Sequence, residues 1–328
     1  MPLASSTSIL VNALKRGYAV GAFNAYNLEM AQAVVQAAEE ETAPVILQVS
    51  RGTIQHAGLE LSAALVKSIA AGARVPVVLH LDHGTDFEIN MRCLREGFTS
   101  LMYDGSREAF EENVRVTKMV VEAAHACGVP VEAELGRIPR IEEFGAGFPG
   151  GAGLRCSAHG EGAMRGGEFL PLEVRAHVAR LFASPEKAAE FVRLTGCDSL
   201  AVACGSVHGM KADVQPLDVR LVAAIASRTG IPLVLHGSSG VVGSRAVAKA
   251  RGLRLETNEG GVEEAIRSGI AKVNVSTELQ AVYLDAVRAH FESEPAVKDV
   301  RKVFSYARAA LKERVKSYIR LFGSSGKA

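Results

Sequence analysis

The sequence lacks the marks of several protein classes. None of its apolar runs approaches the ~18 residues that a membrane span requires. Lysine plus arginine (37) almost balances aspartate plus glutamate (36), so the net charge of +1 suggests neither a nucleic-acid partner nor an acidic one. Residues 1–20 contain no basic region followed by an apolar core and a cleavage site. We therefore expect a cytoplasmic protein with no membrane and no nucleic-acid partner.

Cysteine is also scarce. The five cysteines form no C-x-x-C pair, which argues against a cysteine-rich metal site, and their odd, scattered placement fits a reducing compartment. With 48% hydrophobic and 22% charged residues, the composition is that of a globular protein with a large core. No linker separates two self-contained halves, so we expect a single domain over residues 1–328.

Three His-Gly pairs each follow a short apolar run. The segments are VVLHLDHG (77–84), SLAVACGSVHG (199–209) and PLVLHG (232–237). They place His83, His208 and His236 at or just past the end of a buried strand. If these strands lie side by side, the imidazoles converge, and three histidines plus an open position are the ligand set of a catalytic zinc ion. The alternative is that each histidine bonds separately to backbone at its own strand end.

The spacing of apolar residues predicts eight strands, each followed by a longer segment of helical pattern such as 28–41 or 108–126. Alternation of strand and helix eight times over predicts an α/β fold, a closed (β/α)8 TIM barrel, in which ligands bind at the carboxyl ends of the strands. The predicted strands are 19–23, 44–49, 76–81, 99–103, 130–135, 198–203, 231–236 and 271–275.

Polar residues stand at the ends of these strands. In a barrel they would face one shared cavity, although each taken singly could instead cap the following helix. They are Asn24, Ser50, Asp82 with His83, Asp104, Glu134, His208, His236 and Asn274.

Two segments have features of a phosphate site. Residues 236–240 (HGSSG) form a glycine-containing turn ahead of a predicted helix, and residues 274–277 (NVST) end the eighth strand. Such turns let backbone N–H groups approach an anion, and the loops after strands seven and eight are the recurrent phosphate site of these barrels. Glycine and serine after a strand can also simply make a turn.

Seven motifs, in order along nearly the whole chain, resemble the class II, zinc-dependent ketose-bisphosphate aldolases. This family includes fructose-bisphosphate and tagatose-bisphosphate aldolases. The motifs are GAFNAYN (21–27), HLDHG (80–84), EAELGRI (132–138), LAVACGSVHG (200–209), LVLHGSSG (233–240), KVNVSTEL (272–279) and FGSSGKA (322–328).

The resemblance implies how metal and substrate are held. His83, His208 and His236 match the zinc ligands, and Asp104 and Glu134 match a second, non-catalytic divalent-cation site of some members. We expect a homodimer or homotetramer, as is common among such relatives. Other positions match contacts to the sugar phosphate or to a monovalent cation (Na⁺ or K⁺): Asn24, Gln48, Ser50, Gly209, Gly237, Ser239, Asn274, Ser276 and Thr277.

The resemblance also assigns the proton transfers. Asp82 matches the catalytic acid/base that takes the hydroxyl proton in cleavage, although a neighbour of a zinc ligand could instead merely orient an imidazole. Glu142 best matches the loop carboxylate that protonates the enediolate carbon, with Glu143 as the alternative. Lys272 is expected in the barrel interior or in helix-side packing, not as an imine-forming lysine.

The chain departs from the family pattern in two places. Residues 144–182 form an extended loop insertion after strand five, which begins beside Glu142 and has a glycine-rich part followed by a helical stretch. Its polar residues could touch substrate, although solvated loop charges are the favoured interpretation: Arg155, His159, Glu161 and Arg165. Ser276 stands where fructose-bisphosphate enzymes tend to have aspartate, and where tagatose-bisphosphate and inositol-pathway aldolases have a smaller or uncharged residue. Ser276 weakens the fructose assignment without replacing it, so we expect fructose 1,6-bisphosphate as the first substrate and tagatose 1,6-bisphosphate as the second. A metal-dependent hydrolase and an inactive companion subunit are the remaining alternatives.

Overall fold

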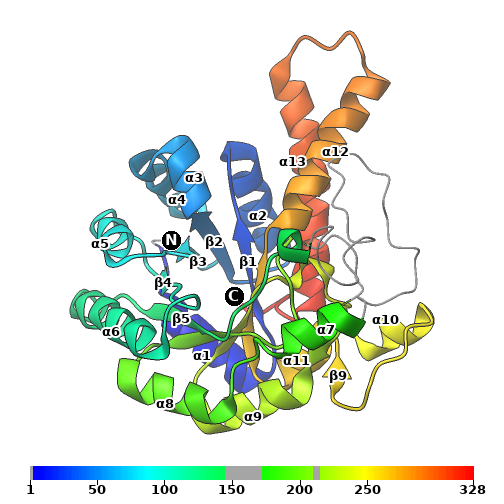
Figure 1. Cartoon of the computed structure of the whole chain (residues 1–328). Coiled ribbons are helices and arrows are strands. Elements are labelled where there is room, and N and C mark those ends of the chain that lie inside the picture. Colours follow the sequence, from blue (N-terminus) through cyan, green and yellow to red (C-terminus); the bar gives the residue numbers. More distant parts are fainter. Residues whose placement is uncertain (1–2, 145–171, 210–214) are drawn as a thin grey trace.

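Eight parallel strands form one barrel-like sheet in the order β3-β2-β1-β10-β8-β6-β5-β4 (Figure 1). The computed structural model describes residues 3–144, 172–209 and 215–328. The predicted (β/α)8 architecture is confirmed, and each predicted strand lies within two residues of an observed one. The strands are β1 (Val20–Asn24), β2 (Val45–Ser50), β3 (Val77–Asp82), β4 (Leu101–Tyr103), β5 (Val131–Leu135), β6 (Ser199–Val202), β8 (Leu233–Leu235) and β10 (Ile270–Val275).

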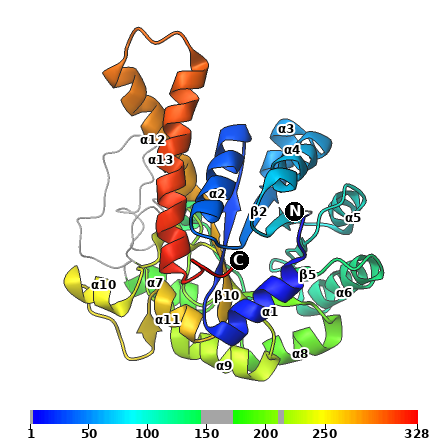
Figure 2. The same cartoon turned by 180° about the vertical axis from the view of Figure 1, so that it is seen from behind.

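Helices surround the sheet, and α12 and α13 form a pair that extends beyond the barrel (Figures 1 and 2). The predicted helices 28–41 and 108–126 are present as α2 and α6. The helices are α1 (Ser6–Arg16), α2 (Leu28–Glu40), α3 (Arg51–Ala57), α4 (Leu59–Gly72), α5 (Phe87–Arg95), α6 (Phe110–Ala126), α7 (Leu172–Ala179), α8 (Pro185–Thr195), α9 (Val219–Thr229), α10 (Arg245–Ala250), α11 (Val262–Arg267), α12 (Thr277–Ser293) and α13 (Val300–Leu321), with 3-10 turns η1 (Ile141–Phe144) and η3 (Ser238–Gly240).

A second, two-stranded sheet was not predicted. Strands β7 (Leu217–Asp218) and β9 (Glu259–Gly260) pair antiparallel, apart from the barrel sheet. Strands of two residues have no measurable alternation, so sequence periodicity cannot reveal them. Across the three described ranges, no helix is long and apolar enough to cross a membrane, and the four cysteines placed there are free thiols.

The predicted insertion is described only at its two ends. Residues 145–171, with Arg155, His159, Glu161 and Arg165, lie outside the described residues. The helical stretch expected after the glycine-rich part is present as α7. That this segment is an insertion relative to other family members stays a prediction.

An apolar layer fills the amino-terminal end of the barrel, where α1 packs across the first residues of the strands. Residues that follow one another at intervals of two along a strand face the same side. The inward-facing residues above this layer are mostly polar, and they lead up to the carboxyl ends of the strands. The apolar layer consists of Leu10, Ala13, Tyr18, Val20, Ala22, Ile46, Val78 and Ala271.

The barrel closes between β3 and β4. Parallel backbone bridges join His80 to Ser100 and Gly84 to Tyr103. A Cβ atom on Gly84 would lie 2.5 Å from the carbonyl oxygen of Met102, which is closer than a real Cβ contact. Closure at this seam therefore requires glycine directly after His83.

We predict that Gly84→Ala lowers the free energy of unfolding by about 1–3 kcal/mol, because a methyl group must displace the backbone of β4. Gly72→Ala is the matched control, since its new methyl group would meet no atom within 4 Å; its effect should stay within about 1 kcal/mol. Urea unfolding followed by circular dichroism measures both. Equal midpoints for the two variants would contradict the tight seam.

Candidate active site

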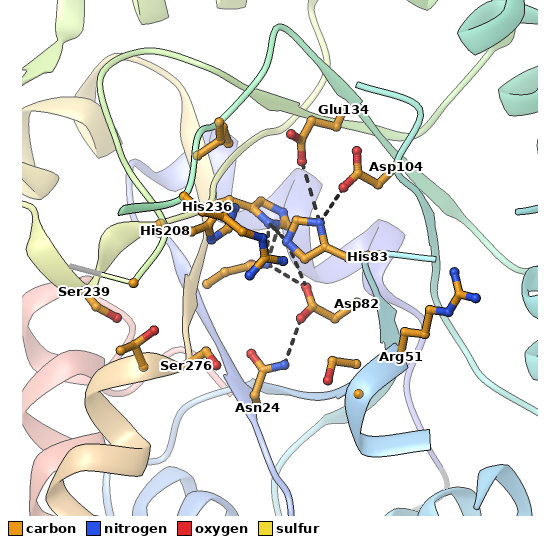
Figure 3. Close-up of a pocket in the computed structure, with 18 of the residues that line it drawn as sticks. Asn24, Arg51, Asp82, His83, Asp104, Glu134, His208, His236, Ser239 and Ser276 are labelled. Atoms are coloured by element: carbon orange, nitrogen blue, oxygen red, sulfur yellow. Dashed lines mark hydrogen bonds and ion pairs between the residues drawn. The ribbon is translucent and has the colours of Figure 1, made fainter. Parts of the chain in front are cut away.

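Three histidines lie together at the mouth of the barrel (Figure 3). His83 directly follows β3, His208 lies in the loop after β6, and His236 directly follows β8. Their candidate ligand atoms all lie within 4.8 Å of one another, and Nε2 of His83 is 3.0 Å from Nδ1 of His236. The histidines are thus neighbours and not three separate strand-end residues. Converging imidazole nitrogens of this kind suit a zinc-like ion.

Tight backbone contacts hold the histidines at this spacing. His83 has a φ of 51°, in the left-handed region that residues other than glycine rarely adopt. Gly237 has a φ of 63°, and a Cβ atom there would lie 3.0 Å from the carbonyl carbon of Val207. The segments that carry His208 and His236 therefore pack backbone against backbone. The glycine of each pair serves close approach, and the histidine supplies the chemistry.

The charge around the cluster favours a cation. Burial lowers the pKa of His208 and of His236 well below the usual value, so both are neutral and have a lone pair to offer. Burial also lowers the pKa of His83, but the charges of Asp82 and the hydrogen bond to Asp104 outweigh burial and raise it to about 10. Negative charge that holds a proton on His83 would equally stabilise a metal ion there.

A second cluster joins His83 to two carboxylates. Nδ1 of His83 lies 2.7 Å from Oδ2 of Asp104 and 3.9 Å from Oε2 of Glu134. This Glu134 oxygen is buried and has no hydrogen-bond partner in the described parts of the chain. Burial and the neighbouring Asp104 charge raise the pKa of Glu134 to about 8. The cluster has the oxygens of a second cation site, and Asp104 alone could also orient the His83 ring.

Asp82 is held by two amides beside the histidines. Nδ2 of Asn24 donates to its Oδ2 at 2.8 Å, and Nδ2 of Asn274 donates to its Oδ1 at 3.3 Å. Burial raises the pKa of Asp82, but the His83 and His236 imidazoles and the Asn24 hydrogen bond lower it more, so it lies below its usual value. Asp82 is therefore an ionised proton acceptor at neutral pH.

The two loop carboxylates have different surroundings. Glu143 pairs with the Arg137 guanidinium and accepts a 3.0 Å hydrogen bond from the backbone N–H of Arg140. Glu142 is exposed, lines the cavity and has no ion-pair partner among residues 3–144, 172–209 and 215–328. The backbone N–H of Ile141 donates to the carbonyl of His208 at 2.9 Å, which ties this loop to the histidine cluster.

Comparison with known proteins decides the family. The family model for fructose-bisphosphate aldolase class-II matches residues 4–327. The chain belongs to this family. It is 42% identical to a fructose-bisphosphate aldolase of Thermus caldophilus, over 99% of this chain and 100% of that protein. It is 39% identical to a probable fructose-bisphosphate aldolase of Bacillus subtilis, over 100% of both.

Solved structures agree with this assignment. The crystal structure of the YdjI aldolase from Escherichia coli K12 has a TM-score of 0.75 and 34% identity, covering 99% of each chain. That of a putative fructose-1,6-biphosphate aldolase from Coccidioides immitis has a TM-score of 0.74 and 29% identity, covering 98% of this chain and 96% of the other. The aldolase fold therefore extends over the whole described chain.

The cavity of this class II aldolase has polar groups at two opposite sides of the histidines. Its volume is roughly 820 Å³. Ser239 and Ser276 lie on one side and Arg51 on the other, with Asp82 and His83 between them (Figure 3). A small, elongated ligand could contact both sides at once.

The predicted phosphate segments lie on the serine side. Gly237 and Thr277 line the cavity there, Ser276 precedes the first residue of α12, and Gly209 also reaches the cavity. The Ser238 hydroxyl donates to the carbonyl of Asn274 at 2.5 Å, which joins the two segments. Both predicted segments thus meet at one end of the cavity, where α12 begins.

Two predicted substrate contacts have other partners in the structure. Gln48 is fully buried, lies one layer below the cavity and donates to Oδ1 of Asn24 at 3.3 Å. Ser50 lines the cavity, but its hydroxyl accepts the backbone N–H of Thr53 at 3.2 Å and so caps α3. Gln48 supports Asn24 here, and its direct contact with substrate stays a prediction.

Several polar residues around the cavity were not predicted from the sequence. The hydroxyl of Tyr26 lies 2.6 Å from that of Ser276. Arg51 directly follows a strand end, so a search one residue beyond each strand would have found it. Arg107, Arg137 and Arg140 lie in loops, where no periodic pattern of apolar residues indicates which side chains face the cavity. The missed polar residues that line the cavity are Tyr26, Arg51, Thr85, Ser106, Arg107, Arg137, Arg140 and Gln280.

We predict that the protein holds one tightly bound zinc ion per chain and that His208→Ala weakens binding more than about 100-fold, because even residues that only support a ligand contribute ~10–100-fold. His56→Ala, on an exposed face of α3, is the control and should bind like the parent protein. Competition with a zinc chelator gives both affinities. Equal affinity of parent and His208→Ala would contradict a three-histidine site.

Proposed function

We propose that this chain catalyses the reversible cleavage of fructose 1,6-bisphosphate to dihydroxyacetone phosphate and glyceraldehyde 3-phosphate. The observation that carries this proposal is the meeting of three histidine ligands with an ionised carboxylate, Asp82, at one barrel mouth. A zinc ion held by His83, His208 and His236 would supply Lewis acidity toward the ketone oxygen. The rest of the reaction needs proton transfers and anion binding, for which the chain has its own residues.

The carboxylates divide the proton transfers. In cleavage the bond between C3 and C4 breaks, its electron pair stays on C3, and Asp82 takes the proton of the C4 hydroxyl. Asn24 and Asn274 hold both Asp82 oxygens toward the cavity. Glu142 then gives a proton to C3, which completes dihydroxyacetone phosphate. Glu143 is held by Arg137 and the Arg140 backbone, which favours Glu142 in this role.

A bisphosphate suits the two ends of the cavity. The loops with Gly237, Ser239 and Thr277 offer backbone N–H groups and a helix N-terminus to one phosphate. Arg51 offers a guanidinium at the other end, fixed there by the Thr85 hydroxyl and by Asp86 at 3.8 Å. We propose that these residues bind the two phosphates.

Ser276 keeps tagatose 1,6-bisphosphate as the second candidate substrate. Its hydroxyl is already bonded to Tyr26, which in turn accepts from Gln280 at 3.1 Å. A neutral hydroxyl pair binds a sugar hydroxyl without the charge of an aspartate, so it discriminates weakly between epimers. An aldolase of the inositol-pathway type is a further alternative that also releases dihydroxyacetone phosphate.

We also propose a second divalent cation at Asp104 and Glu134 and a monovalent cation, Na⁺ or K⁺, near the phosphate loops. The buried Glu134 oxygen, which has no hydrogen-bond partner among the described residues, supports the divalent site. A homodimer or homotetramer stays our prediction for the assembly. The non-catalytic alternative, an inactive companion subunit, is disfavoured because Asp82, Glu142 and all three histidines reach the same cavity.

We predict that zinc-loaded protein releases dihydroxyacetone phosphate from fructose 1,6-bisphosphate, that a chelator abolishes release, and that added zinc restores it. A coupled assay with tagatose 1,6-bisphosphate in parallel gives the kcat/KM ratio of the two sugars. If zinc-loaded protein released no dihydroxyacetone phosphate from either sugar, the proposal would be refuted.

We predict different defects for the two proposed proton carriers. Asp82→Asn should lower kcat for cleavage about 10²–10⁴-fold, since the proton acceptor is lost. Glu142→Gln should slow exchange of the dihydroxyacetone phosphate C–H proton with labelled water by a similar factor.

Glu143→Gln is the matched neighbour and should leave proton exchange within a few-fold of the parent enzyme. If Glu143→Gln instead slows exchange more than Glu142→Gln, the two assignments must be reversed. Zinc content, measured on every variant, shows whether a loss of rate is merely a loss of metal.

A further inference from the structure

A buried charged layer lies directly below the proposed active site. His80, Glu132 and Lys272 precede Asp82, Glu134 and Asn274 by two residues on β3, β5 and β10. Because side chains alternate along a strand, each member of the first trio faces the barrel interior one layer deeper than its partner at the mouth. The lower trio is 1–2% exposed.

The lower layer is connected to a metal ligand. Oε1 of Glu132 lies 2.8 Å from Nε2 of His236, and Oε2 accepts from Nζ of Lys272 at 2.8 Å. Nζ of Lys272 is 3.4 Å from Nε2 of His80. Lys272 lies in the barrel interior, as expected, and its ammonium is engaged there. It does not face the cavity as an imine-forming lysine would.

The chain of contacts continues to the closed end of the barrel. Nδ1 of His80 lies 2.8 Å from the hydroxyl of Ser100, which accepts from the Ser6 hydroxyl of α1 at 3.0 Å. A buried carboxylate and a buried ammonium without partners would each be costly. Here the Glu132 carboxylate and the Lys272 ammonium are each other's partners. The layer is therefore a rigid support and not a pair of isolated charges.

We infer that Glu132, held by Lys272, is a positioning residue that sets the tautomer and ring orientation of His236. A carboxylate at Nε2 keeps the ring proton there, which leaves the Nδ1 lone pair directed toward Nε2 of His83, 3.0 Å away in the histidine cluster. This role deepens the proposed function, since it rests on His236 being a metal ligand.

Asn274 cannot select the tautomer in place of Glu132. Its Nδ2 lies 3.2 Å from Nδ1 and 3.0 Å from Nε2 of His236, so it is nearly equidistant from both ring nitrogens. It also donates to Asp82. Glu132 contacts only one ring nitrogen and is an obligate acceptor when ionised, so it distinguishes them.

The test is the zinc affinity of Glu132→Ala, measured by chelator competition, together with the thermal midpoint of the metal-free protein. We expect zinc binding to weaken by about 10–100-fold, with altered visible absorption of the cobalt-substituted protein, because the ring can now turn and change tautomer. Glu132→Gln keeps an acceptor oxygen of the same size and should recover part of the affinity.

Thr117→Val is the matched control. Thr117 is fully buried in α6, and its hydroxyl donates to Oδ1 of Asn113 at 3.1 Å, so its loss costs a buried hydrogen bond that involves neither Glu132 nor His236. This variant should lose thermal stability and keep the parent zinc affinity. If Glu132→Ala does not fold, the combined Glu132→Gln and Lys272→Met variant removes both buried charges and should still show weakened zinc binding.

The outcomes separate the two claims. Parent protein that binds no zinc and cleaves no sugar would refute the proposed function itself. Parent protein that does both, with Glu132→Ala and Glu132→Gln binding zinc as tightly as Thr117→Val, would overturn the positioning role and leave Glu132 as a structural ion pair. Weakened zinc binding in the Glu132 variants alone supports the inference.

Discussion

Closure of a parallel barrel is the constraint on which the site depends. Eight strands that run the same way bring their carboxyl ends to one rim, so residues separated by more than a hundred positions meet there. The seam between β3 and β4 completes the barrel, and Gly84 allows the two strands to approach there. His83 occupies this seam in a left-handed conformation, so the geometry of the ligand cluster is joined directly to closure.

The alternation of side chains along each strand then divides the interior into layers. An apolar layer under α1 closes the lower end, a paired polar layer follows, and the mouth lies above it. The polar groups of the middle layer take the place of apolar side chains, and burying them away from water is unfavourable for folding. Because these groups pair with one another, that unfavourable free energy is reduced. Its value is rigidity beneath His236, since a metal site functions only if its ligands are held in place.

At the mouth of the barrel, the carboxylates and the guanidinium of Arg51 occupy different places. Carboxylates surround His83, which favours a cation at the centre, whereas Ser239 and Ser276 stand on one side of the cavity and Arg51 on the other (Figure 3). Glu142 and Glu143 are adjacent in sequence, but within the part of the chain that the structure describes arginine contacts hold only the second. The Glu143 carboxylate is therefore engaged in ion pairs, whereas the Glu142 carboxylate remains available for proton transfer.

The sequence by itself determined the number and order of the barrel strands, the polar residues at their ends and the three histidines, because apolar periodicity and strand-end chemistry are local properties. It could not place Gln48 below the cavity, Glu132 against His236 or Arg51 opposite Ser239. Those relations depend on depth along the barrel axis and on register between strands far apart in the chain. Only the closed tertiary structure decided them, because hydrogen bonding across the whole sheet sets which residues share a layer.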